Sequence, residues 1–119
     1  MRLSSLSMEN FRGFERREFQ LHPQFNLLIG ENGSGKTSLL EAASIAIGAW
    51  LLAFPSTDAR HIRLRDVRRV SEDLGGRYRE LPQYPVRITA IGEISQTEGN
   101  EAASHTASPI PVTWERTLN

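Results

Sequence analysis

The chain has 119 residues, of which 39% are hydrophobic, 24% charged and 8% aromatic, a composition typical of one globular domain rather than a disordered segment. Fourteen basic and fourteen acidic residues cancel, so no overall field attracts nucleic acid or an anionic membrane, and local patches must carry any such binding. The absence of cysteine excludes disulfides and thiolate metal sites. No stretch approaches the roughly 18 apolar residues that span a membrane, and no signal-peptide core opens the chain, so we expect a soluble, cytoplasmic protein without a membrane partner.

Two segments of alternating polar and apolar residues open the chain, residues 3–11 and 15–21. Gly13 lies in the short connection between them, and Pro23 follows the second segment. This pattern predicts two strands joined as a β-hairpin.

A glycine-rich loop with suitable flanks comes next. Residues 25–29 (FNLLI) are almost continuously apolar, which predicts a strand buried on both faces of a mostly parallel sheet. The following GENGSGKT, residues 30–37, matches the phosphate-binding pattern of Gly, four residues and Gly-Lys-Ser/Thr without a mismatch. Leu39, Ala43, Ile47 and Leu51 then recur every four residues and predict the apolar face of a helix. A glycine-rich surface turn is the alternative, but it explains neither flank.

The loop residues have distinct physical roles if a triphosphate lies there. Gly30, Gly33 and Gly35 allow sharp backbone turns that bring N–H groups against phosphate oxygens. Lys36 would reach the β- and γ-phosphates, and the Thr37 hydroxyl would complete the coordination of a magnesium ion. The helix beginning near Lys36 would direct its positive end at the anion. The predicted cofactors are therefore ATP and Mg²⁺.

A basic segment begins at Arg60 and ends at Arg69, with five arginines in ten residues. It either faces DNA phosphates, where each neutralised phosphate adds salt-dependent affinity, or forms a solvated surface with Asp66 paired locally. His61 is expected at the surface, because no second histidine or carboxylate stands at metal spacing nearby.

The remaining sequence predicts a helix and two strands. The helix covers residues 67–74 and is ended by Gly75 and Gly76. Val86, Ile88 and Ala90 alternate with polar residues, so residues 85–94 form a strand with one buried face. Residues 110–118 alternate in the same way, and the polar residues 95–108 between the two strands predict a flexible hairpin loop.

The first 50 residues resemble the SMC/RecF/OLD-like branch of ABC-type P-loop ATPases, among the AAA family ATPases. NFRGF (residues 10–14) is similar to the opening motif of that branch, and LIGENGSGKTSLLEA (residues 28–42) to its phosphate loop and first helix. The resemblance implies that Arg12 lies near the nucleotide and that Asn32 helps to cradle the γ-phosphate. A solvated hairpin-tip charge is the alternative for Arg12, and a turn residue for Asn32. The candidate nucleotide-binding residues are Arg12, Gly30, Asn32, Gly33, Ser34, Gly35, Lys36, Thr37 and Ser38, with Thr37 also the metal ligand.

The same resemblance implies that catalytic parts lie outside the chain. The family hydrolyses ATP with an acidic pair after an apolar strand and with a Ser-Gly-Gly signature from a second subunit. None of the three aspartates follows such a strand, and the Gly75-Gly76 pair lacks the serine. Strands 85–94 and 110–118 match the small β-subdomain that the family inserts after its first helix. Gln96 and the acidic-Val-Arg segment at residues 66–68 are given no role.

The expected fold is α/β: a partial P-loop NTPase sheet with an N-terminal β-hairpin, a Walker A strand-loop-helix and a small antiparallel β-subdomain. We expect a single incomplete ATP-binding domain over residues 1–119, divided into 1–54, an Arg-rich connection 55–84 and the β-subdomain 85–119. The expected function is that of the ATP-binding N-terminal part of a RecF/SMC-like ATPase acting in DNA repair, recombination or phage defence, without ATP hydrolysis by this chain alone. Its expected partners are ATP, a second ATPase subunit or a missing C-terminal half, and DNA at residues 60–69. The alternative is a non-enzymatic truncated module that pairs with a full-length ATPase; a small P-loop kinase fits less well, because a long hairpin precedes the loop.

Overall fold

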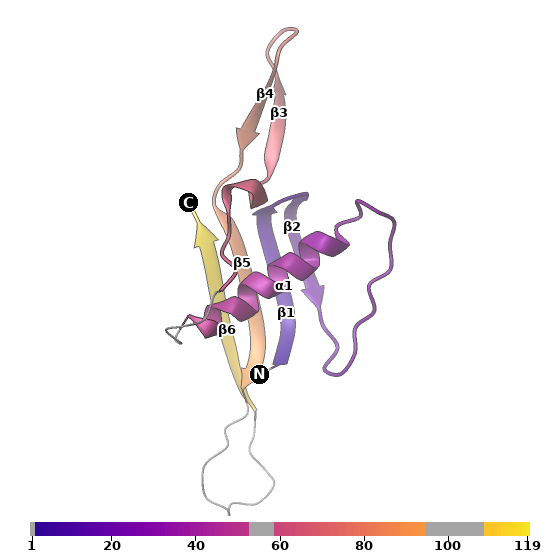
Figure 1. The fold of residues 1–119 in the computed structure, drawn as a ribbon, viewed down its shortest axis with the longest axis vertical. Coiled ribbons are helices and arrows are strands. Elements are labelled where there is room, and N and C mark those ends of the chain that lie inside the picture. Colours follow the sequence, from indigo (N-terminus) through magenta and orange to yellow (C-terminus); the bar gives the residue numbers. More distant parts are fainter. Residues whose placement is uncertain (1, 53–58, 95–108) are drawn as a thin grey trace, which may run out of the picture.

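Four long strands and one helix make up the body of the protein (Figure 1). The structure, a computed structural model, describes residues 2–52, 59–94 and 109–119. The elements in chain order are β1 (Arg2–Phe11), β2 (Phe14–Gln20), α1 (Lys36–Leu51), a short 3₁₀ helix η1 (Leu64–Asp66), β3 (Arg69–Asp73), β4 (Tyr78–Pro82), β5 (Val86–Ile94) and β6 (Ile110–Leu118). The predicted hairpin at the start of the chain and the predicted strands at its end are confirmed.

The four long strands form one antiparallel sheet in the order β2-β1-β5-β6. The central pairing joins β1 to β5, with Met8 opposite Ile88 and Glu9 opposite Arg87. Strands β5 and β6 pair antiparallel, as expected of the two strands within residues 85–119, and they extend the sheet begun by the first hairpin. The reason is a shared core, because alternate residues of β5 are buried on the same face as Leu6 and Met8.

Helix α1 crosses the apolar face of this sheet (Figure 1). Its buried residues are Leu39, Ala42, Ile45, Ala46 and Gly48; three of these five are alanine or glycine, which lets the helix approach the strands closely. The predicted apolar face is thus rotated: Ile47 is 40% exposed, and Leu40 is 60% exposed. At the far end of the helix, the indole N–H of Trp114 donates to the carbonyl of Ala46 over 2.8 Å, and the Trp50 and Trp114 rings meet edge to face at 5.2 Å.

The opposite face of the sheet is polar. Arg87, on the central strand β5, pairs with Glu9 of β1 and with Glu115 of β6, both over 3.2 Å. One face therefore builds the core under α1, and the other is solvated.

Strands β3 and β4 form a two-stranded hairpin that projects beyond the end of the sheet (Figure 1). The helix predicted over residues 67–74 is wrong, because residues 69–73 are β3. Eight residues are too few for a helix to be stable without packing, and all five residues of β3 are exposed. Gly75 (φ +74°) and Gly76 (φ +95°) take left-handed conformations and turn the chain back into β4 instead of ending a helix.

The apolar run at residues 25–29 is not a strand, contrary to the prediction. Phe25, Leu27 and Ile29 are 72%, 69% and 85% exposed. A strand buried on both faces needs neighbouring strands and covering layers, and no strand within residues 2–52, 59–94 and 109–119 pairs with this segment. The expected parallel sheet is likewise missing from that part of the chain, where every strand pair is antiparallel.

Two expectations fall on residues that the structure does not describe: the polar loop at residues 95–108, and Gln96 within it. Within the described ranges, no helix combines the length and apolar character needed to cross a bilayer.

Candidate functional site

The N-terminus of α1 and the turn between β1 and β2 enclose a pocket of about 410 Å³. The pocket is lined by Gly13 and Phe14 from the turn and by residues 32–38 from the glycine-rich loop and the first turn of the helix. Within the loop, the Ser34 N–H donates to the carbonyl of Glu31 over 3.1 Å, which closes a tight turn. The Lys36 amine donates to the carbonyl of Gly30, so this side chain folds back over the loop.

Two glycines of the loop take conformations that other residues rarely adopt. Gly33 has φ +87° and Gly35 has φ +99°, both in the left-handed region. Gly35 also has no room for a side chain, because a Cβ atom there would lie 2.5 Å from Cζ of Phe14. The phenyl ring of Phe14, in the hairpin turn, therefore packs directly against the glycine-rich loop at Gly35.

Hydrogen-bond donors at the start of α1 face no competing acceptor from a side chain. The first helical hydrogen bond runs from the Leu39 N–H to the Gly35 carbonyl over 2.9 Å, so the preceding N–H groups have no partner within the helix. No side chain of the described residues caps this end, and the first turn carries no acidic residue. Unpaired N–H groups, the positive end of the helix dipole and the Lys36 amine together make a donor set that fits a phosphate group. The Thr37 and Ser38 hydroxyls border the same pocket.

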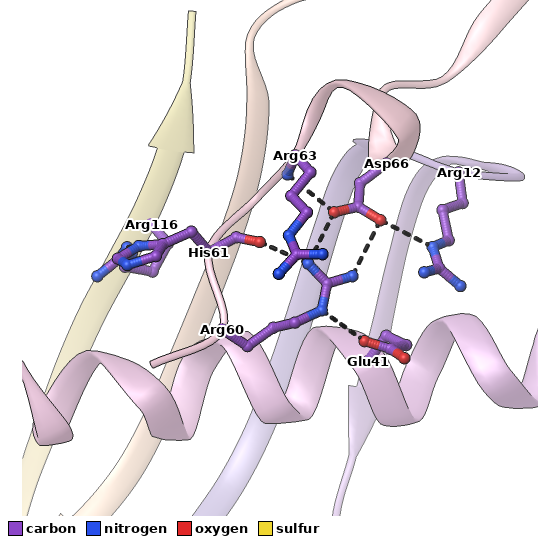
Figure 2. Close-up of polar contacts among 7 residues, drawn as sticks. All are labelled: Arg12, Glu41, Arg60, His61, Arg63, Asp66 and Arg116. Carbon is purple, nitrogen blue, oxygen red and sulfur yellow. Dashed lines mark hydrogen bonds and ion pairs between the residues drawn. The ribbon is translucent and has the colours of Figure 1, made fainter. Parts of the chain in front are cut away.

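A buried carboxylate lies behind the hairpin turn (Figure 2). Asp66 of η1 is completely buried and accepts hydrogen bonds from three directions. Arg60 donates to both carboxylate oxygens, over 3.0 and 3.1 Å; Nε of Arg12 donates over 3.1 Å and the backbone N–H of Arg63 over 2.9 Å. Nε of Arg60 also donates to Glu41 of α1 over 2.7 Å. We call Arg12, Glu41, Arg60 and Asp66 the Asp66 cluster.

The cluster is held in its charged state. Burial by itself would raise the pKa of Asp66, but hydrogen bonds from Arg60, the Arg63 amide and Arg12 outweigh it and leave this pKa below its usual value. The hydrogen bond from Arg60 and its positive charge lower the pKa of Glu41. The hydrogen bond to Asp66 in turn raises the pKa of Arg60 against the opposing effect of burial. Two cations thus balance two anions behind the pocket.

Arg12 lies beside the pocket rather than in its lining. Its side chain is 24% exposed and is engaged with Asp66, so it differs from the solvated hairpin-tip charge that was the alternative. Its guanidinium also lies 5.6 Å from the centre of the Phe11 ring. The predicted loop residues Asn32, Gly33, Ser34, Gly35, Lys36, Thr37 and Ser38 all line the pocket, whereas Gly30 reaches it only through the Lys36 amine.

The basic segment is not one continuous patch. Arg60 points inward to Asp66 with a side chain only 14% exposed, whereas Arg63, Arg65 and Arg69 are exposed. His61 is exposed as predicted, and its Nδ1 lies 2.6 Å from a guanidinium nitrogen of Arg116. The residues of the described ranges include no group of three His, Cys, Asp or Glu side chains placed to hold a metal ion.

Sequence reasoning missed the buried position of Asp66. The available signal was a single acidic residue inside a run of arginines, in an acidic-Val-Arg segment that had no assigned role. A lone carboxylate among cations can be a buried counter-ion as well as a surface partner.

The glycine-rich loop carries the phosphate-binding sequence pattern and leads into the N-terminus of α1, although residues 25–29 before it do not form a strand. The AAA domain family matches residues 5–119, and the chain belongs to this family. Among curated proteins, it is similar to the DNA replication and repair protein RecF of Rickettsia massiliae (strain Mtu5), with 44% identity over 71 residues. The RecF proteins of Rickettsia canadensis (strain McKiel) and Rickettsia felis (strain ATCC VR-1525 / URRWXCal2) are both 42% identical over 71 residues.

Each of these matches covers 60% of this chain and 18% of the relative, so the chain matches less than a fifth of the length of these proteins. The resemblance to the RecF-containing branch of P-loop ATPases is confirmed.

Proposed function

We propose that the chain binds ATP with Mg²⁺ in the pocket between the hairpin turn and the glycine-rich loop, as the nucleotide-binding part of a DNA-repair ATPase. The observation that carries this proposal is the loop conformation. Gly33 and Gly35 adopt left-handed backbone angles directly before an uncapped helix N-terminus, and this combination presents backbone N–H groups to an anion.

The proposed roles follow from the positions of the side chains. Lys36 would exchange the Gly30 carbonyl for the β- and γ-phosphate oxygens, and it is the lysine of the phosphate-binding pattern. The Thr37 hydroxyl would contribute to Mg²⁺ coordination, while Asn32, Ser34 and Ser38 donate to phosphate oxygens from the lining of the pocket. The bound ion would neutralise charge on the phosphates. We expect binding without turnover, because the family's acidic pair does not follow any apolar strand in this sequence.

The test is a calorimetric titration of the chain with ATP and Mg²⁺, with released phosphate measured in the same samples. Lys36→Ala is expected to weaken binding at least about tenfold, because Lys36 is the one basic residue among the described residues that line the pocket. Arg79→Ala is the matched control: it also removes one positive charge, but from the exposed β4, where the side chain is 62% exposed. Equal affinity of the wild type and Lys36→Ala would refute the assigned phosphate site.

A second candidate function rests on exposed apolar surface. The segment at residues 25–29 and the outer side of α1, with Leu40 60% and Ile47 40% exposed, offer uncovered apolar groups to a second polypeptide. We propose a second ATPase chain, or further sequence of the same protein, as the partner. Sedimentation velocity of the wild type and of Ile29→Asp tests pairing between copies. Concentration-dependent association that the variant loses supports pairing, and identical monomeric behaviour of both proteins argues against it.

Binding of duplex DNA is the third part of the proposal. Arg63, Arg65 and Arg69 are the exposed arginines of the basic segment, so they, rather than Arg60, would meet phosphates. Replacing these three residues with alanine should lower DNA affinity and flatten its salt dependence. An unchanged salt slope would exclude the basic segment as the contact.

A further inference from the structure

We propose that Asp66 is a positioning residue for the nucleotide pocket: it holds the hairpin turn, residues 10–14, against the glycine-rich loop. The inference rests on the proposed function, because it assigns a role in nucleotide binding to a residue outside the pocket. It also gives a role to the acidic-Val-Arg segment at residues 66–68.

The first step is the contact between Asp66 and the turn. The N–H of Arg12 donates to the backbone carbonyl of Asp66 over 2.7 Å, and Nε of Arg12 donates to its carboxylate over 3.1 Å. Val67 forms an isolated β-bridge with Phe11, and the N–H of Arg68 donates to the carbonyl of Asn10 over 2.9 Å. The segment at residues 66–68 is therefore bound to the turn along its backbone, by two hydrogen bonds and one β-bridge.

The second step is that the turn needs this support. Asn10 (φ +52°) and Arg12 (φ +51°) both have left-handed backbone angles without being glycine. Asparagine tolerates such a conformation, but it is unfavourable for an arginine and persists there where the surroundings impose it. Asn10 is fixed by its side-chain amide, which donates to the carbonyl of Pro85 over 2.9 Å, and Arg12 is fixed by the backbone and carboxylate of Asp66.

The third step connects the turn to the pocket. Gly13 and Phe14, the residues after Arg12, form one side of the pocket lining. The Phe14 ring lies on Gly35, where a Cβ would come within 2.5 Å of it. A shift of the turn therefore moves one wall of the pocket and releases a contact on the loop itself.

The fourth step fixes the other end of the connection. Arg60 joins Asp66 to Glu41, which lies on α1 five positions after Lys36 (Figure 2). Asp66 is thus tied to the turn through Arg12 and to the helix that starts at the pocket through Arg60. A carboxylate that served only as a counter-ion for Arg60 would need no contact with the turn.

The experiment compares Asp66→Asn with Asp73→Asn, an identical change on the exposed strand β3 away from the pocket. Three quantities are measured: the Kd for ATP with Mg²⁺, amide hydrogen exchange of residues 10–14 without nucleotide, and the emission of Trp50 and Trp114, which reports the docking of α1 on β6. For Asp66→Asn we expect at least a tenfold higher Kd and faster exchange in the turn, with unchanged tryptophan emission. For Asp73→Asn we expect no change in any of the three.

A second variant separates positioning from stability. Arg12→Gln removes the side-chain link to the turn but leaves the Arg60 contacts with Asp66 and Glu41 in place. We expect it to weaken ATP binding to the same degree, and the double variant to bind no more weakly than either single one, because both changes break one connection. Losses that add in the double variant would overturn the proposal, as would a Kd within twofold of the wild type for either single variant.

The outcomes distinguish the two proposals. If the wild type binds no ATP, the proposed function fails, and hydrogen exchange alone decides the positioning role: faster exchange of the turn in both variants supports it, and unchanged exchange refutes it. If Asp66→Asn loses its native tryptophan emission, the same decision is made with Arg12→Gln.

Discussion

Replacing Arg60 with methionine should destabilise the protein far more than any exposed arginine does. The change keeps an aliphatic side chain of similar length but removes two hydrogen bonds to Asp66, one to Glu41 and one to the backbone carbonyl of His61. Asp66 is completely buried, so water cannot replace the lost donors. Leaving one partner of a buried ion pair uncompensated costs about 3–5 kcal/mol. We expect about 3 kcal/mol, the low end, because Asp66 retains its donors from Arg12 and Arg63.

The assay is urea unfolding at pH 7, followed by tryptophan emission, with Arg65→Met as the matched control because Arg65 is exposed. A loss of about 3 kcal/mol is a large share of the 5–15 kcal/mol that stabilises a typical domain, and it corresponds to a fall in Tm on the order of 10 °C. Combining Arg60→Met with Asp66→Asn should recover part of the loss, since the uncompensated charge is removed. The reasoning fails if Arg60→Met costs no more than Arg65→Met, within about 0.5 kcal/mol.

Two further predictions concern acid and the loop. The pKa values of Asp66 and Glu41 are lowered in the folded protein, so their contribution to stability is complete above the unfolded-state pKa values, near pH 4, and is lost as the pH falls through the lower folded-state values. Urea unfolding measured from pH 7 to 3 should therefore give a constant free energy of unfolding down to about pH 5 and a decline below it. A free energy of unfolding that stays constant to pH 3 would contradict this prediction. Gly35→Ala should lower both stability and ATP affinity, because it places a Cβ against Phe14 at a position with a left-handed φ. Gly75→Ala is the control, because Gly75 also has a left-handed φ but a Cβ there would meet no atom within 4 Å. If both variants lower the melting temperature equally, the contact with Phe14 is unimportant.

The sequence alone predicted the strands that pair with a neighbour in sequence and the elements whose buried residues recur at the regular spacing of a strand. The hairpin was readable from the alternation on both sides of Gly13, and β5 from Val86, Ile88 and Ala90, which are all fully buried. The start of α1 at Lys36 followed from the glycine-rich pattern. These signals need only the residues of the element itself.

Long-range relations were not readable in this way. The residues of β5 do not show whether this strand pairs with β1 or forms a two-stranded sheet with β6 alone, because both arrangements bury the same alternate residues. The run at residues 25–29 has the composition of an internal strand, but composition cannot supply the neighbouring strands that would cover it. For the site, the pattern identified the loop, whereas the position of Asp66 behind the turn depends on contacts between segments 54 residues apart.

The central pairing of β1 with β5 has a consequence for how the chain folds. Glu9 and Arg87, which face each other across it, are 78 residues apart in sequence. At a synthesis rate of about 5–20 residues per second, β1 leaves the ribosome roughly 4–16 s before its central partner is made. During that interval the first hairpin is a two-stranded ribbon of marginal stability, and α1 has no complete sheet on which to bury Ile45 and Ala46. Nucleation must therefore wait for β5, and the high contact order of this topology predicts slow, late and cooperative folding rather than step-by-step growth from the N-terminus.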